Sequence, residues 1–260
     1  MDDAIEAAVE RVIKAMRENL GEQITMDDMA RTAMFSKFHF SRIFLRVTGI
    51  SPGRFLSALR LQEAKRLLRT TSMPVADISH IVGYNSIGTF SSRFRFSVGV
   101  SPSEYRQYDG LVAPLPAPAP TGTGVVRGHI WSTPGCRPGN MLVGLFPGRI
   151  AQGTPVRHVT RSGIGPFEIA GVPSGHWHVL AHAADAAYDL PAAEARRHYV
   201  AAFGPVEVSP TSTTNNDFDM WLRPPLIFDP PALLAHLDPR ALAAETWVPD
   251  RVDESTLSGA

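Results

Sequence analysis

The sequence lacks the features that mark secreted or membrane proteins. Cys136 is the single cysteine, so the chain cannot form an internal disulfide or a cysteine metal cluster. No stretch approaches the roughly 18 consecutive apolar residues that a membrane-spanning helix needs. The acidic N-terminus is unlike a signal peptide. We therefore expect a soluble, cytoplasmic protein without a membrane partner.

Motifs for catalysis and cofactor binding are also missing. The chain has no glycine-rich phosphate loop, no serine nucleophile elbow and no paired Cys/His motif. His176 and His178 alternate along a predicted strand but have no clear third ligand for a metal. Asp217 and Asp219 alternate similarly and are interpreted as a solvated strand face. We expect no enzyme activity, no cofactor and no metal.

Lysine is scarce, and the three lysines all precede residue 111. The formal net charge of zero hides an uneven distribution. Residues 36–106 contain 11 Lys and Arg against three acids, a net charge of +8, whereas residues 111–260 contain 10 Arg against 13 acids, a net charge of −3. A basic segment of this kind allows a neutral protein to carry a phosphate-binding face.

Proline is rare before residue 110 and frequent afterwards. Residues 111–124 alternate proline with small residues, a pattern that excludes a helix and favours an extended spacer. Helical periodicity dominates residues 1–110, and short strand patterns dominate residues 125–250. The predicted fold class is therefore an all-α domain (1–110), a linker (111–124), an all-β sandwich-like domain (125–250) and a tail (251–260).

An internal repeat at an offset of 50 residues lies within the helical half. Seven identities and one aromatic exchange support two copies of one supersecondary unit. The first-copy residues are Ser36, Phe40, Ser41, Phe44, Gly49, Ser51, Pro52 and Phe55, matched by Ser86, Phe90, Ser91, Phe94, Gly99, Ser101, Pro102 and Tyr105.

Each copy is typical of a short helix, a tight turn and a second helix with a polar outer face. The first copy has helices at 26–33 and 37–48, with Ser36 as the N-cap and Gly49 as the stop. The second has helices from Val75 and from Asn85, and one longer helix connects the copies. This pattern predicts two helix-turn-helix units.

These residues resemble the AraC/XylS family of bacterial transcription regulators. The resemblance rests on MARTAMFSKFHFSRIFLRVTGISP, RLQEAKRLL and VADISHIVGYNSIGTFSSRFRFSVGVSPSEYR, within residues 5–108. It implies that the second helix of each unit enters one of two successive major grooves on one face of DNA. Family members commonly carry their other domain on the N-terminal side, so the order here is reversed.

The resemblance places specific side chains on DNA. It implies base contacts from Lys37, Phe38, Ser41 and Arg42 in the first unit, and from Ile87, Gly88, Ser91 and Ser92 in the second. Arg42 can bond guanine bidentately and Phe38 can pack on thymine methyl groups. Lys37 and His39 suit contact with phosphate better than contact with bases. The further phosphate candidates are Arg54, Arg60, Lys65, Arg93, Arg95 and Arg106, and Ser86 is a further DNA-binding candidate.

The second half reads as strands separated by turn signals. The stretch GPFEIAGVPSGHWHVLAHA resembles the prealbumin-like sandwiches related to carboxypeptidase regulatory domains. Residues 190–204 predict a short inserted helix, and residues 229–245 a helical tail.

The sequence thus predicts a DNA-binding transcription regulator whose C-terminal domain senses an effector or contacts proteins. The partners are double-stranded DNA and, as open alternatives, RNA polymerase and a small-molecule effector. Monomer and homodimer both stay open. The alternative for the C-terminal half is a carbohydrate-binding or enzymatic module targeted to DNA.

Overall fold

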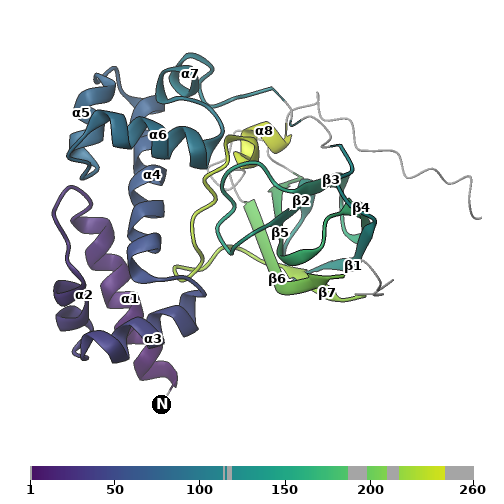
Figure 1. Cartoon of the computed structure of the whole chain (residues 1–260), viewed down its shortest axis with the longest axis horizontal. Helices are drawn as coiled ribbons and strands as arrows, with labels where there is room; N and C mark the ends of the chain where they lie inside the picture. The colour runs from purple at the N-terminus through teal and green to yellow at the C-terminus, as the bar shows by residue number, and fades with distance from the viewer. Residues whose placement is uncertain (1, 114, 116–118, 187–197, 210–216, 244–260) are drawn as a thin grey trace, which may run out of the picture. The chain divides into compact units, whose positions relative to one another are not determined.

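The computed structural model describes residues 2–113, 115, 119–186, 198–209 and 217–243 and divides into two compact units (Figure 1). The helical unit comprises Met1–Ala113 together with two later segments, Phe146–Pro155 and Pro225–Asp238. The sheet unit comprises Pro114–Leu145, Val156–Pro224 and Pro239–Ala260. A helical region is therefore followed by a sheet-rich region, as the sequence predicted in outline.

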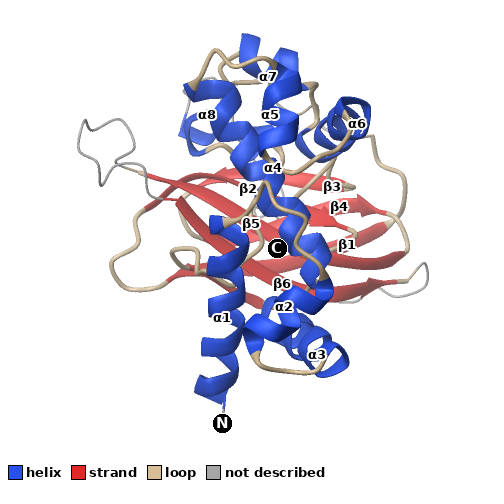
Figure 2. Ribbon diagram, turned by 90° about the vertical axis from the view of Figure 1, so that its left-hand side faces the viewer, coloured by secondary structure: helices blue, strands red, loops and turns tan. Residues whose placement is uncertain are grey.

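Seven α-helices form the described part of the helical unit: α1 (Asp2–Glu18), α2 (Met26–Ala33), α3 (Lys37–Thr48), α4 (Pro52–Thr70), α5 (Val75–Ile81), α6 (Ile87–Val98) and α7 (Pro102–Gln107). Helices α1 to α3 gather at one end of α4, and α5 to α7 at the other (Figures 1 and 2). The bounds predicted for α2 and α3 are confirmed. The helix predicted from Asn85 begins two residues later, because Ser86 serves as its N-cap.

The caps of α3 and α6 repeat the same chemistry. The hydroxyl of Ser36 accepts a hydrogen bond from the His39 amide, and that of Ser86 accepts one from the Thr89 amide, each at 3.4 Å. Both helices end at a glycine in the left-handed region, Gly49 with φ 75° and Gly99 with φ 95°. Glycine suits this conformation because it has no Cβ to clash with the backbone.

Each copy is also built around the same trio of aromatic rings. In the first, Phe40 contacts Phe44, which contacts Phe55, with 5.5 Å between ring centroids at both steps. In the second, the corresponding steps from Phe90 to Phe94 and from Phe94 to Tyr105 are 5.6 Å each. All six side chains are buried. The repeat in the sequence is therefore a repeat of the core.

The two later segments of the helical unit complete its core, and together we name them the C-terminal strap. Ile150, Leu233 and Ala235 are buried among the helical core residues. The amides of Leu233 and Leu234 both donate to the carbonyl of Ala151, which joins the two segments. No sequence pattern predicted that residues so far along the chain would pack here, and the domain bounds at 110, 124 and 250 stay predictions.

The described strands of the second region form two sheets: β1 (Gly124–Ser132), β2 (Pro138–Phe146), β3 (Arg157–Ser162), β4 (Gly165–Val172), β5 (Gly175–Asp185), β6 (His198–Val208) and β7 (Asp219–Leu222). One sheet has the order β4-β1-β7 and the other β3-β2-β5-β6 (Figure 2). Strands β1 and β7 pair in parallel, whereas the pairs β1–β4, β2–β3 and β5–β6 are antiparallel. Apolar residues from both sheets share one core.

Two predictions for the second region need correction. The predicted helix at 190–204 is wrong over its last residues, because His198–Val208 pairs antiparallel with β5 as a strand; residues 187–197 lie outside the described part. The helical tail is reduced to η2 (Ala235–Leu237) and α8 (Pro239–Ala243), and the tail at 251–260 is not among the described residues. No helix in the described chain is long and apolar enough to cross a membrane.

Candidate nucleic-acid interface

The outer face of α3 is open along its N-terminal half. Lys37, Phe38, His39 and Arg42 are exposed, and Ser41 is half-buried. The exposed fraction of Phe38 is 87%. Burying an aromatic ring of this size is strongly favourable, so an exposed Phe38 at the start of a polar helix face marks a surface suited to contact with a partner.

The charged groups on α3 differ in how they are held. Lys37 Nζ lies 2.7 Å from Asp27 Oδ2 on α2, and both side chains are more than half exposed. An exposed pair of this kind contributes only about 0–1 kcal/mol, so a DNA phosphate can replace Asp27. Arg42 has neither a hydrogen bond nor an ion pair to any described residue, which leaves its guanidinium available to bind.

Helix α6 presents the corresponding positions with smaller side chains. Ile87, Gly88, Ser92 and Arg95 are exposed and Ser91 is half-buried, while Ser86 is committed to capping the helix. Ile87 is 47% exposed. This face therefore offers hydroxyl and apolar groups, with its positive charge at Arg95.

The remaining sequence-predicted residue of α6, Arg93, lies elsewhere on the helix. Its side chain lines a small cavity together with Arg54 of α4 and residues of the strap. Arg93 is exposed like Ile87 and Arg95, but neither of those residues is among the residues that line this cavity.

Three further arginine and lysine candidates for phosphate contact are used inside the helical unit. Arg60 donates to the carbonyls of Leu20 and Glu22 at 3.0 and 2.6 Å. Arg106 donates to the carbonyls of Leu68 and Met73 at 3.2 and 2.5 Å. Such bonds satisfy backbone carbonyl groups that have no partner within a helix. These side chains hold helices together in the structure, and phosphate contact stays a prediction for them.

Lys65 is the third. Its ammonium group donates to the carbonyl of Leu233 in the strap at 3.0 Å and lies 5.7 Å from the centre of the Tyr105 ring. Burial lowers its pKa from the ordinary 10.5 to about 8, while the nearby carboxylate of Asp238 acts in the opposite direction. Lys65 is therefore part of the strap's attachment.

The turn of the second helix-turn-helix unit depends on Gly83. Its φ is 84°, and a Cβ there would lie 2.5 Å from the Leu20 carbonyl oxygen and 2.7 Å from the Arg60 guanidinium. Both the backbone conformation and the space require glycine. The first unit uses Met34 at the corresponding turn, with φ 62° and a side chain that is 83% exposed.

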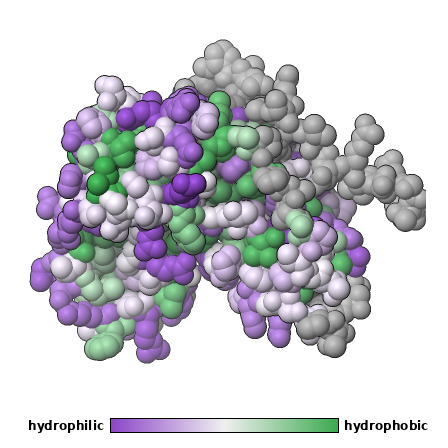
Figure 3. All heavy atoms as spheres, turned by 45° about the horizontal axis from the view of Figure 1, so that its top comes forward, coloured by the Kyte–Doolittle hydropathy of each residue, from purple (hydrophilic) through white to green (hydrophobic). Residues whose placement is uncertain are grey.

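Exposed Met34 was not singled out by sequence, and neither was Phe96, which is 63% exposed on α6. A helical projection alone cannot show which edge of a helix the rest of the fold covers. Polar and apolar side chains are mixed on the surface in view in Figure 3.

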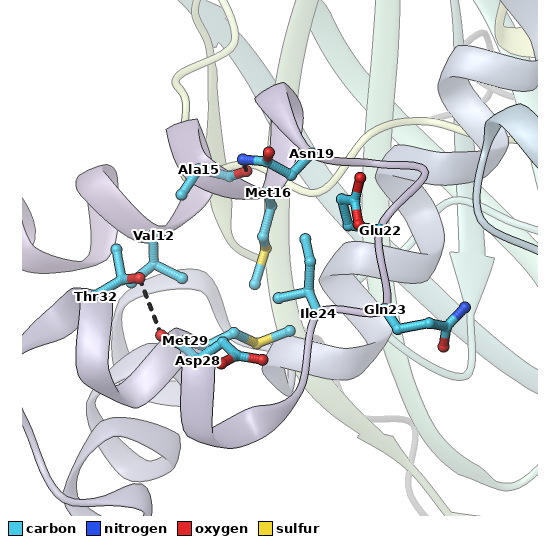
Figure 4. A pocket seen from close by; sticks show the side chains of 10 residues that line it. All are labelled: Val12, Ala15, Met16, Asn19, Glu22, Gln23, Ile24, Asp28, Met29 and Thr32. Atoms are coloured by element: carbon cyan, nitrogen blue, oxygen red, sulfur yellow. Dashed lines mark hydrogen bonds between the residues drawn. The ribbon is translucent and has the colours of Figure 1, made fainter.

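A pocket of about 240 Å³ lies between α1, α2 and the loop that joins them (Figure 4). Met16, Ile24 and Met29 form its apolar wall. Asp28, at its edge, is engaged in the capping box with Thr25, whose hydrogen bonds lower the pKa of that carboxyl group. The lining is thus core and cap residues, and we assign no chemistry to it.

In the sheet unit, Asp219 has a more specific contact than the solvated strand face predicted for it. The indole Nε1 of Trp131 donates to Asp219 Oδ1 at 2.8 Å, and Trp131 stacks between His129 and Trp221. His176 is exposed on β5. Across the described residues, no three His, Cys, Asp or Glu side chains are grouped so that they could hold a metal.

Two copies of a helix, a tight turn and an open-faced second helix, joined by one long helix, define a tandem helix-turn-helix protein. Residues 29–108 match a family described as "Helix-turn-helix domain". The chain is 31% identical to the HTH-type transcriptional activator AarP of Providencia stuartii, over 39% of this chain and 75% of that protein. It is also 31% identical to the transposon Tn10 TetD protein of Escherichia coli, over 38% of this chain and 72% of that protein.

Among solved structures, a transcriptional regulator with an AraC-type DNA-binding domain from Chromobacterium violaceum is similar. The identity is 28% and the TM-score 0.39, with 40% of this chain and 93% of that chain covered. The chain belongs to the AraC family of DNA-binding helix-turn-helix transcription regulators.

Proposed function

We propose that this protein binds specific sites on duplex DNA by placing α3 and α6 in two successive major grooves. The observation that carries this proposal is the repeated frame. The same caps and the same aromatic trio hold both helices, so equivalent N-terminal positions of the two helices are left open. Paired recognition helices generally read sites one helical turn, about 34 Å, apart.

In the first unit, Arg42 reads a guanine through its O6 and N7 atoms, because its guanidinium has no competing partner among the described residues. Phe38 contacts thymine methyl groups. Ser41 donates or accepts one further hydrogen bond. Lys37 leaves its ion pair with Asp27 and binds the DNA instead, and His39 contacts the DNA backbone.

In the second unit, the exposed group at each position is smaller. Ile87 packs on a thymine methyl, Gly88 allows close approach of the helix backbone, and Ser91 and Ser92 bond base edges or phosphates. Ser86 caps the N-terminus of α6 where this helix approaches the DNA backbone, and Arg95 contacts a DNA phosphate. With no bidentate side chain on this face, we expect weaker base selection from α6, supplemented by DNA shape.

For the C-terminal region, we propose a β-sandwich related to carboxypeptidase regulatory domains that senses an effector or contacts proteins such as RNA polymerase. Its two sheets with one shared core support the sandwich. The strap supports a regulatory role, because two segments connected directly to its strands are built into the helical core. One chain carries both recognition helices, so a monomer is sufficient for two grooves; a homodimer is the alternative.

The test is selection of bound sequences from random duplex DNA by the full chain, alongside the variants Arg42→Ala and Arg11→Ala. Arg11 is an exposed arginine on α1 and serves as the charge-matched control. We expect a bipartite motif, with preference relaxed at one base position by Arg42→Ala only. Failure of the wild-type chain to enrich any motif at moderate salt would overturn the proposal.

A further inference from the structure

A cavity of about 150 Å³ lies within the helical unit, where α4 and α6 face the strap. Its apolar side is formed by Ala58, Ile150 and Leu233, which are all buried. The rest of its lining is Gly53, Arg54, Ser57, Arg93 and Gln152. Water's share of liquid volume is ~30 Å³, so the cavity has room for on the order of five waters, or one phosphate or carboxylate group.

The charges that face this cavity are of one sign. Arg54 and Arg93 both line the cavity from exposed positions, and no Asp or Glu is among the lining residues. Neither arginine has a hydrogen bond or ion pair to the described part of the chain. A guanidinium presents paired N–H donors that match an oxyanion.

Polar groups from the strap and α4 complete the donor set. The Gln152 side-chain carbonyl accepts a hydrogen bond from Ser97 Oγ at 3.2 Å, which leaves its NH₂ group to donate. The Ser57 hydroxyl is a further donor. The Gly153 amide donates to the Ser97 carbonyl at 3.0 Å, so the strap is fixed against α6 at this point. The donors therefore come from three separate elements that meet at the cavity.

We propose that this cavity is a binding site for a phosphate or carboxylate oxyanion, held by Arg54 and Arg93 with help from Gln152 and Ser57. The bound anion joins the linker helix α4, the recognition helix α6 and the strap. It therefore stabilises the placement of the second recognition helix relative to the rest of the helical unit. Two sources supply this chemistry: a small anion in solution and a phosphate of the DNA backbone.

The first arm of the test uses the full chain without DNA, titrated with inorganic phosphate by calorimetry in a chloride buffer. For a site that takes free anions, we expect one phosphate per chain, and affinity lowered about tenfold or more by either Arg54→Gln or Arg93→Gln. Arg11→Gln, the exposed control, leaves the affinity unchanged. Thermal unfolding without phosphate verifies that each variant is folded.

The second arm measures how the affinity for the selected operator depends on salt. If wild-type protein binds no free phosphate but each arginine variant reduces the salt slope by ~0.9, the anion is a DNA phosphate. If the two variants change neither phosphate binding nor the salt slope, the site does not exist. Because the first arm uses no DNA and Arg42 is left intact, this result is distinguishable from failure of the proposed base recognition.

Discussion

The two helix-turn-helix units share a core but not a surface. Helices α3 and α6 have the same serine N-cap, the same glycine C-cap and the same buried aromatic trio. Their open faces differ: α3 carries Lys37, Phe38 and Arg42, whereas α6 carries Ile87, Gly88 and Ser92 at the equivalent positions. Packing fixes what is repeated, and the positions that packing leaves free are those that differ.

The strap approaches the C-caps of both recognition helices. The Arg149 side chain of the strap occupies the space that a Cβ on Gly49 would enter, and Leu234 lies 3.4 Å from the position that a Cβ on Gly99 would occupy. The strap is also hydrogen-bonded to Ser97 of α6. The two units therefore differ in the side chains of their open faces, and the strap is hydrogen-bonded to the second unit through Ser97.

The largest expected effect tests whether the two cores are equivalent. Phe44→Ala and Phe94→Ala each remove a fully buried ring, so each should lower the free energy of unfolding by about 3–5 kcal/mol. Urea denaturation measures this, with exposed Phe96→Ala as the control that changes stability by less than about 0.5 kcal/mol. If one variant lost much of its free energy of unfolding and the other lost none, the two cores would not be equivalent.

A substitution in the core of the strap is expected to lower the free energy of unfolding by a comparable or smaller amount. Leu233→Ala removes a side chain that is 1% exposed in the helical core and should cost about 2–5 kcal/mol. Leu226→Ala, at a strap position that is 54% exposed, is the matched control. If both variants unfold at the wild-type urea concentration, the strap does not stabilise the helical unit.

The difference between the recognition faces should appear in DNA binding. Arg42→Ala should weaken binding to the selected operator by about 1–3 kcal/mol, because a bidentate contact to guanine is lost. Ser92→Ala removes at most one neutral hydrogen bond and should cost about 0.5–1.5 kcal/mol. Titration by fluorescence anisotropy measures both; an equal loss on operator and random DNA would reassign Arg42 to a phosphate.

The last prediction concerns pH and the attachment of the strap. The pKa of Lys65 is lowered to about 8 by burial, so between pH 8 and 10.5 the unfolded chain binds more protons than the folded one. The stability contributed by this group therefore rises with pH across that window and is constant below it. Urea unfolding at several pH values should show the rise in wild type and in Lys14→Met, and its loss in Lys65→Met.

Most of the helical frame was predictable, because caps, glycine stops and aromatic spacing are local signals. The bounds of α2 and α3 followed from Thr25, Ser36 and Gly49 alone. The strap was not predictable: Ile150 lies in a segment for which no helix or strand was predicted, the helical tail predicted over 229–245 indicated no partner for Leu233, and the partners of both residues are far away in sequence.

The candidate site was predictable only in part, for a related reason. A helical projection places Arg60 and Arg106 on a polar face, but it cannot reveal carbonyl groups that arrive from residues 20–22 or 68–73. The assignment of Lys37, Phe38 and Arg42 to an open face needed only the repeat and the buried stripe, and these side chains are exposed.

The central claim is that α3 and α6 read two half-sites on one face of the duplex. The most direct measurement is the affinity of the full chain for its selected operator after insertion of about five or about ten base pairs between the half-sites. An insertion of about five base pairs rotates one half-site to the opposite face, and a rigid tandem unit should then bind no better than to a single half-site. An insertion of about ten base pairs returns both half-sites to the same face of the duplex, but it separates them by more than one chain can span. A monomer should therefore lose affinity for this DNA as well. Unchanged affinity for both insertions would contradict simultaneous reading by the two helices.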